Sequence, residues 1–149
     1  MSTYSMNQYQ QNQIATASPE RILLMLYDGA IRFTRQALQG IEEQRPEQKR
    51  YGIGKAMAII SEFSNSLNHE IGGKIAEDLD ALYDFMIREL MAANLKDDAD
   101  KLANVEKLLG DLRQTWAEAI ELNKKQAAAP AANFRRPVEE HYTPLAISS

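Results

Sequence analysis

The sequence predicts an all-α fold, an antiparallel four-helix bundle over residues 18–123, with an N-terminal segment at 1–17 and a flexible tail at 124–149. Apolar residues recur at spacings of three and four in four successive segments, which is typical of amphipathic helices. No segment alternates apolar and polar residues as a strand would, and the connections between the four segments are short. Each apolar stripe needs a neighbour, and short connections make neighbouring helices antiparallel.

The first helix is expected to begin at Pro19. Ser18 can accept a hydrogen bond as the N-cap, Pro19 suits the first helical position, and Glu20 complements the positive end of the helix dipole. The charged run at 42–47 contains Pro46, which predicts the first loop. The apolar positions of this helix are Leu23, Leu26, Tyr27, Ala30, Phe33, Ala37 and Leu38.

The second helix is expected over residues 48–69, and the glycine pair at 72–73 is expected to form its C-terminal turn. Gly52 and Gly54 weaken its beginning, because each costs about 1 kcal/mol relative to alanine inside a helix. Its apolar positions are Ala56, Ile59 or Ile60, Phe63 and Leu67.

The third and fourth helices have the broadest and the most regular apolar patterns. The third is expected to end at Asn94, and the fourth to open at Asp97 and Asp98. The third carries Ile75, Leu79, Leu82, Met86 and Leu90, flanked by Ala76, Tyr83, Ile87 and Ala93. The fourth carries Leu102, Val105, Leu109, Leu112, Trp116 and Ala119, a spacing typical of coiled-coil-like packing.

The composition excludes several classes of protein. The 149 residues suffice for one core, and the formal net charge of −4 makes nucleic acid and anionic lipid poor partners. The chain has no cysteine, which excludes disulfides, thiolate metal sites and a cysteine nucleophile. No apolar run reaches the roughly 18 residues of a membrane span, and the N-terminus does not read as a signal peptide. We therefore expect a cytoplasmic protein without stable membrane insertion.

The two histidines give no support to a catalytic or metal site. A di-iron site in a bundle would need inward carboxylates and Glu-x-x-His pairs, but Ser66 precedes His69 by three residues and Val138 precedes His141. We interpret His69 as a polar residue near the negative end of a helix. No set of nucleophile, base and orienting group can be assembled, so we expect neither an enzyme nor a cofactor.

The first and third helices carry more apolar residues than packing against a single neighbouring helix requires. They are either the two most buried helices, or they line a groove for another amphipathic segment. Met25, Met86 and Met91 would give such a groove an adaptable lining.

Three blocks of the sequence carry recognisable motifs. Residues 7–31 read NQYQQNQIATASPERILLMLYDGAI, with a tyrosine before a T-A-S-P helix start and then L-Y-D-G-A. Residues 70–94 contain G-G-K-I-A and then L-Y-D-F-M-I-R-E-L-M-A-A-N, and Val105 to Trp116 is an apolar block that ends in tryptophan. In this order the three blocks resemble the flagellar secretion chaperone family FliS, with its L-Y-D-G-A, its G-G-x-I-A and L-Y-x-Y-M-x-R-x-L-x-x-A-N pattern, and its last helix. Phe85 stands where the family commonly has tyrosine, Asp78 where asparagine is frequent, and the tail is longer than the family needs.

The resemblance implies a cytoplasmic export chaperone with no catalysis and no nucleotide. Its client would be the disordered C-terminal segment of flagellin, held in apolar grooves so that it does not polymerise early and can reach a component of the flagellar export gate. An anti-sigma factor or another flagellar regulator is a further candidate partner. A helical adaptor that uses the same grooves to form a homodimer is an alternative, as is a small metal-binding bundle enzyme, which the histidine count disfavours.

The resemblance also implies binding residues, although spacing alone does not separate groove from core. Tyr27, Tyr83 and Asn94 are expected at contacts or boundaries, since each carries a polar group that needs a partner or water if buried. Tyr9 and Ile14 are assigned to an N-terminal lid over a vacant groove. The full set of groove candidates is Leu23, Leu26, Tyr27, Ala30, Ile31, Leu79, Leu82, Tyr83, Met86, Leu90 and Asn94.

Overall fold

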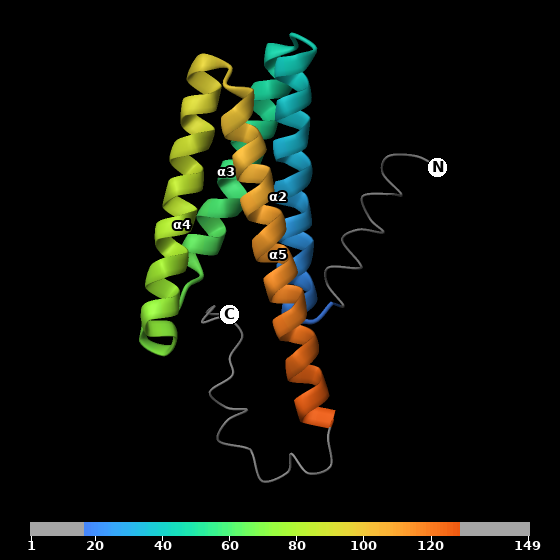
Figure 1. Cartoon of the computed structure of the whole chain (residues 1–149), viewed down its shortest axis with the longest axis vertical. Helices are drawn as coiled ribbons and strands as arrows, with labels where there is room; N and C mark the ends of the chain where they lie inside the picture. Colours follow the sequence, from blue (N-terminus) through green and yellow to red (C-terminus); the bar gives the residue numbers. More distant parts are fainter. Residues whose placement is uncertain (1–16, 129–149) are drawn as a thin grey trace, which may run out of the picture.

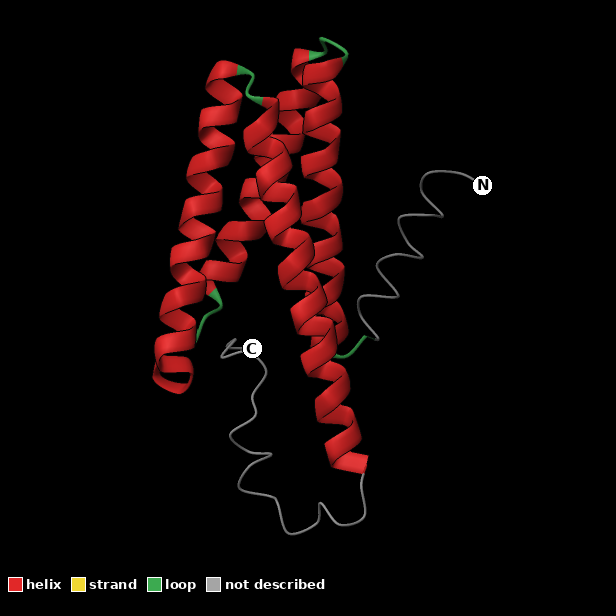
Figure 2. Ribbon diagram, viewed as in Figure 1, coloured by secondary structure: helices red, strands yellow, loops and turns green. Residues whose placement is uncertain are grey.

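The computed structural model describes residues 17–128, and all four elements within them are helices. They are α2 (Pro19–Glu42), α3 (Pro46–Asn65), α4 (His69–Lys96) and α5 (Ala99–Ala128). Figure 2 shows short loops and no strand in this part of the chain. The all-α prediction is confirmed, and none of the described helices is both long and apolar enough to cross a membrane.

The four helices form a ring of neighbours. Helix α2 packs against α3 and α5, and α4 packs against α3 and α5. Each connection is short, so successive helices run in opposite directions along the bundle (Figure 1). Helices α4 and α5 diverge from the loop that joins them. We call the far end, where α2 and α4 begin and α3 and α5 end, the splayed end.

The predicted beginning of the first helix is confirmed. The Ser18 side chain accepts a hydrogen bond from the Arg21 amide at 3.2 Å, and Pro19 is the first helical residue. The predicted first loop is shorter than expected. Pro46 is the first residue of α3. A proline is tolerated there, because the N–H group of a residue at the first helical position has no intrahelical acceptor and can be absent without loss.

The predicted boundary between the second and third helices was wrong. Helix α3 ends at Asn65, and Asn68 caps the next helix by accepting a hydrogen bond from the Ile71 amide at 3.1 Å. Gly73 does break the helix, with φ +49°, but the break lies within α4, after its first turn. His69 is therefore the first residue of α4, at the positive end of a helix and not at the negative end.

The two later boundaries lie beyond the expected residues. Helix α4 continues past Asn94 to Lys96, where Asp97 adopts a left-handed conformation at φ 53°. Helix α5 continues past residue 123 to Ala128. The remainder of the predicted tail, and the predicted N-terminal segment up to residue 16, lie outside the described residues.

The core is one apolar cluster drawn from all four helices. Most of the predicted apolar positions of the second and fourth helices are buried in it, including Phe63 and Trp116. The apolar stripe of the third helix is divided between core and surface, because Ile75 is 63% exposed while Leu79, Met86 and Leu90 are buried. The fully buried large side chains include Tyr27, Ile53, Ile60, Tyr83, Met86, Leu90, Leu102, Val105 and Leu109.

Helices α2 and α3 approach each other closely at Gly52. A Cβ atom at this position would lie 2.5 Å from the Phe33 carbonyl oxygen and 2.8 Å from the Ala37 amide nitrogen, both backbone atoms of α2. At Gly54, on the exposed side of the same helix, a Cβ atom would meet nothing within 4 Å.

Alanine at these two glycines should therefore have opposite effects. Gly52→Ala is expected to lower the free energy of unfolding by about 1–3 kcal/mol, because α2 must move away. Gly54→Ala should raise it by up to about 1 kcal/mol, because alanine is the better helix former. Urea unfolding of both variants measures this, and equal effects at the two sites would contradict the close approach.

Candidate functional site

An apolar hollow lies between the beginning of α2 and the end of α3, at the splayed end. It has a volume of about 370 Å³. Leu26 is 38% exposed at this hollow, while Leu23 and Phe63 are buried residues whose side chains form part of its wall. We call it the α2/α3 hollow. Its lining is Pro19, Ile22, Leu23, Leu26, Glu62, Phe63 and Ser66.

A second apolar surface runs along α4. Ile75 is 63% exposed and Phe85 is 39% exposed, and Leu82 between them is partly exposed. Their spacing places these three residues on one side of the helix. Glu89, one turn after Phe85, accepts a hydrogen bond from Lys101 of α5 at 3.1 Å, so this side of α4 is turned toward α5. We call Ile75, Leu82 and Phe85 the α4 stripe.

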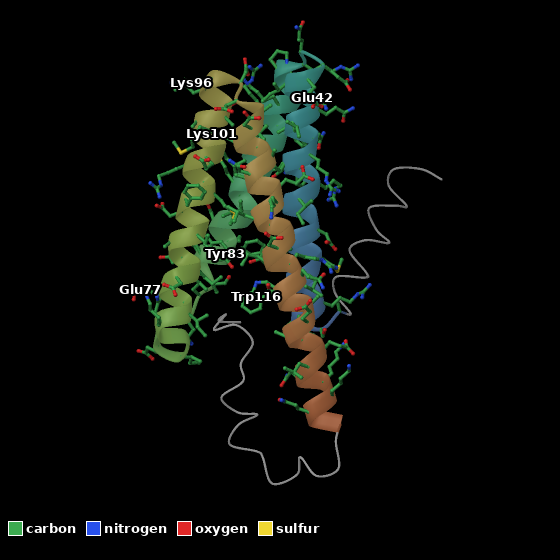
Figure 3. The ribbon with its side chains drawn as sticks, in the orientation of Figure 1. Glu42, Glu77, Tyr83, Lys96, Lys101 and Trp116 are labelled. Carbon is green, nitrogen blue, oxygen red and sulfur yellow. The ribbon has the colours of Figure 1, made fainter. Side chains whose placement is uncertain are left out.

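Behind these surfaces, three aromatic side chains join α2, α4 and α5 through hydrogen bonds. The hydroxyls of Tyr27 and Tyr83 lie 2.8 Å apart, and the Trp116 indole N–H donates to the Tyr27 hydroxyl at 3.0 Å. Phe63 of α3 stacks on Tyr27, with ring centroids 4.3 Å apart. Tyr83 and Trp116 lie at neighbouring levels of the bundle in Figure 3. The polar atoms that Tyr27 and Tyr83 bring into the core are therefore partnered there.

Burial raises the pKa of the Tyr27 hydroxyl above 10.0, and it raises the pKa of Tyr83 further, with the nearby Tyr27 adding to the rise. The protonated hydroxyl is thus favoured in the folded state. In the unfolded chain the tyrosine pKa lies near 10. The contribution of the raised pKa to the free energy of unfolding is therefore fully present below pH 10 and is lost as the pH rises above that value.

The free energy of unfolding should therefore fall above pH 10 by as much as about 1.4 kcal/mol per pH unit for each of the two tyrosines. The double variant Tyr27→Phe with Tyr83→Phe should fall less steeply, because it lacks both hydroxyls. Urea unfolding between pH 8 and pH 11 compares the two proteins. Identical slopes would contradict the assigned role of the tyrosines.

The structure separates the predicted groove residues into exposed and buried groups. Leu26, Ile31 and Leu82 retain exposed surface, and Leu23 lies at the wall of the α2/α3 hollow. Asn94 lies away from these surfaces, near the loop that joins α4 and α5, and is partly buried. The predicted lid residues Tyr9 and Ile14 lie outside the described residues. The predicted groove residues that are buried in the core are Tyr27, Ala30, Leu79, Tyr83, Met86 and Leu90.

Three surface residues were not among the predicted site residues. Ile22 lines the α2/α3 hollow, and Ile75 and Phe85 belong to the α4 stripe. Ile75 continues the spacing of Leu79 and Leu82, so the sequence places it on the same apolar stripe without distinguishing core from groove. Ile75 follows the break at Gly73, which the glycine pair signals in the sequence, and it lies where α4 and α5 diverge, for which the sequence pattern carries no signal.

The opposite end of the bundle holds a more polar hollow. It has a volume of about 590 Å³ and lies between α3 and α4. The buried Lys49 donates to the Asn94 carbonyl at 3.0 Å and to the Asp97 carboxylate at 2.5 Å, which ties α3 to the end of α4. The Asn94 side-chain oxygen is buried without a hydrogen-bond partner. The lining is Lys49, Arg50, Met57, Met91, Asn94 and Leu95.

Within residues 17–128, no group of three or more histidine, aspartate or glutamate side chains is placed to hold a metal ion. The α2/α3 hollow and the α4 stripe are instead largely apolar, and Glu62 is the charged residue in the lining of the hollow. Such surfaces are suited to contact with the apolar face of another helix.

Comparisons with known proteins agree on one family. Residues 2–123 match the family model described as flagellar protein FliS. The flagellar secretion chaperone FliS of Bacillus subtilis is 41% identical over 117 residues, which cover 78% of this chain and 86% of that protein. The protein of the same name from Campylobacter jejuni is 36% identical over 75% of this chain and 88% of its own length. The protein of that name from Salmonella typhimurium is 36% identical over 72% of this chain and 81% of its own length.

Proposed function

Because the chain belongs to the FliS family of flagellar secretion chaperones, a family without enzymatic activity, we propose that its client is the C-terminal segment of flagellin. Binding in the cytoplasm would keep this segment from polymerising prematurely and would help to deliver the subunit to the flagellar export apparatus. The observation that carries the proposal is the location of the α2/α3 hollow and the α4 stripe, which bring apolar surface from three helices to the splayed end.

The two surfaces suit a client that orders as it binds. Ordering a disordered segment consumes about 2–5 kcal/mol of the gross interaction, so the contact must extend over many residues. Burial of about 1,000 Å² of apolar area at about 25 cal/mol per Å² would contribute on the order of 25 kcal/mol before ordering and association costs. Two separate surfaces on one bundle end support a long contact of this kind.

The predicted binding residues fall into three groups in this proposal. Leu23, Leu26 and Leu82 contact the client, whereas the partly buried Ile31 packs against the core outside the lining of the α2/α3 hollow. The buried residues, Tyr27, Ala30, Leu79, Tyr83, Met86 and Leu90, hold α2 and α4 in the position that presents the surfaces. Asn94 acts at the opposite end, where it supports the loop between α4 and α5.

The N-terminal segment supplies a lid in this proposal. Tyr9 and Ile14 precede Pro19, whose side chain lines the α2/α3 hollow, so only a short length of chain separates the lid residues from that surface. Client binding would then displace them. Deleting residues 1–16 should strengthen client binding, and an unchanged affinity would contradict the lid.

A polymerisation assay tests the protective role. Flagellin of the same organism is seeded with filament fragments, and filament growth is followed by light scattering with and without this chain. One equivalent of the chain should suppress growth, whereas growth at the unprotected rate would contradict the proposal. Sedimentation of the same mixtures distinguishes a one-to-one complex with flagellin from a homodimer of the bundle that does not bind flagellin.

A further inference from the structure

We infer that residues 129–149 of this chain dock on the α4 stripe and compete there with the client, an inference whose competitive part rests on the proposed function. The family match ends at residue 123, so this segment lies outside the part of the chain that matches the family model. The occupant that we propose for the stripe is therefore a piece of the same molecule that the family match does not include, and its effect would be regulatory.

The α4 stripe is an apolar surface, and its part nearest to the splayed end has no described partner. Ile75 is 63% exposed and Phe85 is 39% exposed, although α4 and α5 are held together one turn further on by Glu89 and Lys101. On α5, Leu122 is 53% exposed near the same end. Helices α4 and α5 diverge toward the splayed end (Figure 1), and Ile75, the stripe residue nearest to that end, is the most exposed of the three. An apolar segment that lies along it would remove this surface from water.

The position at which α5 ends brings the segment to this surface. Helix α5 runs to Ala128, at the end of the bundle where α4 begins. Residues 129–149 could span about 70 Å when extended, whereas the distance along α4 from Ile75 to Phe85 is about 15 Å. The segment is therefore long enough to lie along the whole stripe.

The segment has apolar side chains suited to such a surface. Pro137 and Pro144 make a continuous helix unfavourable, so the contact would be made by an extended chain. Tethering raises the effective concentration of the segment to the order of 1 mM, so a contact with a Kd well below about 1 mM is occupied most of the time. The apolar residues are Phe134, Val138, Tyr142, Leu145 and Ile147.

A spin label on the full-length chain tests the docking. The chain has no cysteine, so His141→Cys gives a unique labelling site in the segment. With the label attached, the NMR amide signals of Ile75, Ala81 and Phe85 should broaden, and those of Ala103 and Lys55 should not. Broadening confined to the last turns of α5 would overturn the inference.

Two exposed apolar residues supply matched variants for this experiment. Ile75→Asp should abolish the broadening on α4. Leu95→Asp introduces the same charge at a residue that is 81% exposed at the opposite end of α4, and it should leave the broadening intact. Broadening that survives Ile75→Asp would refute docking on the stripe.

Addition of the flagellin C-terminal segment tests competition separately. The broadening should disappear as the segment binds, and the double variant Phe134→Asp with Leu145→Asp should bind it about tenfold more tightly than the unaltered chain. The charge-matched variant Thr143→Asp with Ser148→Asp should bind as the unaltered chain does. Client binding that leaves the broadening in place would refute competition. Broadening without any client binding would support docking and contradict the proposed function.

Discussion

Replacement of Phe63 by alanine is expected to lower the free energy of unfolding by about 3–5 kcal/mol, the usual cost of removing a buried aromatic ring. Phe63 is 2% exposed, stacks on Tyr27 at 4.3 Å and lies 5.5 Å from the Tyr83 ring. Its loss would leave a cavity between α3 and the two tyrosines, and it would deepen the α2/α3 hollow. Urea unfolding followed by circular dichroism measures the loss.

Phe85→Ala is the matched control for this substitution. The Phe85 ring is 39% exposed on the α4 stripe, so its removal should cost less than about 1 kcal/mol. A loss of several kcal/mol at both positions would show that the stripe is part of the core. A small loss at Phe63 would contradict the packing of the aromatic cluster.

The double variant Leu26→Asp with Leu82→Asp should weaken binding of the flagellin segment at least about 100-fold. One carboxylate would enter the α2/α3 hollow and the other the α4 stripe, where a client helix would bury both without partners. Both leucines retain exposed surface, so the bundle itself should remain folded. Calorimetric titration measures the affinity, and circular dichroism checks the fold.

The control for this variant is a pair of charges elsewhere on the surface. Leu95→Asp with Tyr51→Asp alters two exposed apolar residues that line neither surface of the splayed end. This pair should bind the flagellin segment as the unaltered chain does. An equal loss of affinity in both double variants would indicate that the client does not bind specifically at the α2/α3 hollow and the α4 stripe.

The aromatic cluster connects the stability of the bundle to the shape of these surfaces. Phe63 is both a core residue and part of the wall of the α2/α3 hollow. Tyr27, Tyr83 and Trp116 hold α2, α4 and α5 in register just behind it. The tyrosine hydroxyls, which suggested contact positions from the sequence, are used inside the molecule for this purpose.

The sequence predicted the helices well where local chemistry decides their ends. The cap at Ser18 and the regular spacing from Leu102 to Trp116 both correspond to the structure. The end of the second helix was wrong because a glycine pair is the usual stop signal, whereas here Asn68 provides an earlier start for α4. The glycine pair still marks an interruption, because Gly73 is non-helical and separates the first turn of α4 from the rest of that helix.

The surfaces of the site were harder to predict, because helical spacing does not distinguish a core residue from an exposed residue on the same stripe. Leu79 and Ile75 are one turn apart, yet one is buried and the other is 63% exposed. The difference depends on where α4 and α5 diverge, which is a property of the packed bundle. The close approach of α2 and α3 at Gly52 is likewise visible only when both helices are in place.

Calorimetric titration of the full-length chain with the C-terminal segment of its own organism's flagellin, with circular dichroism of the mixture, tests the central claim most directly. We predict one-to-one binding with a micromolar or lower Kd and a gain in helix as the client orders. A folded, monodisperse chain that shows no heat of binding and no gain in helix at high concentrations of the segment would contradict the claim.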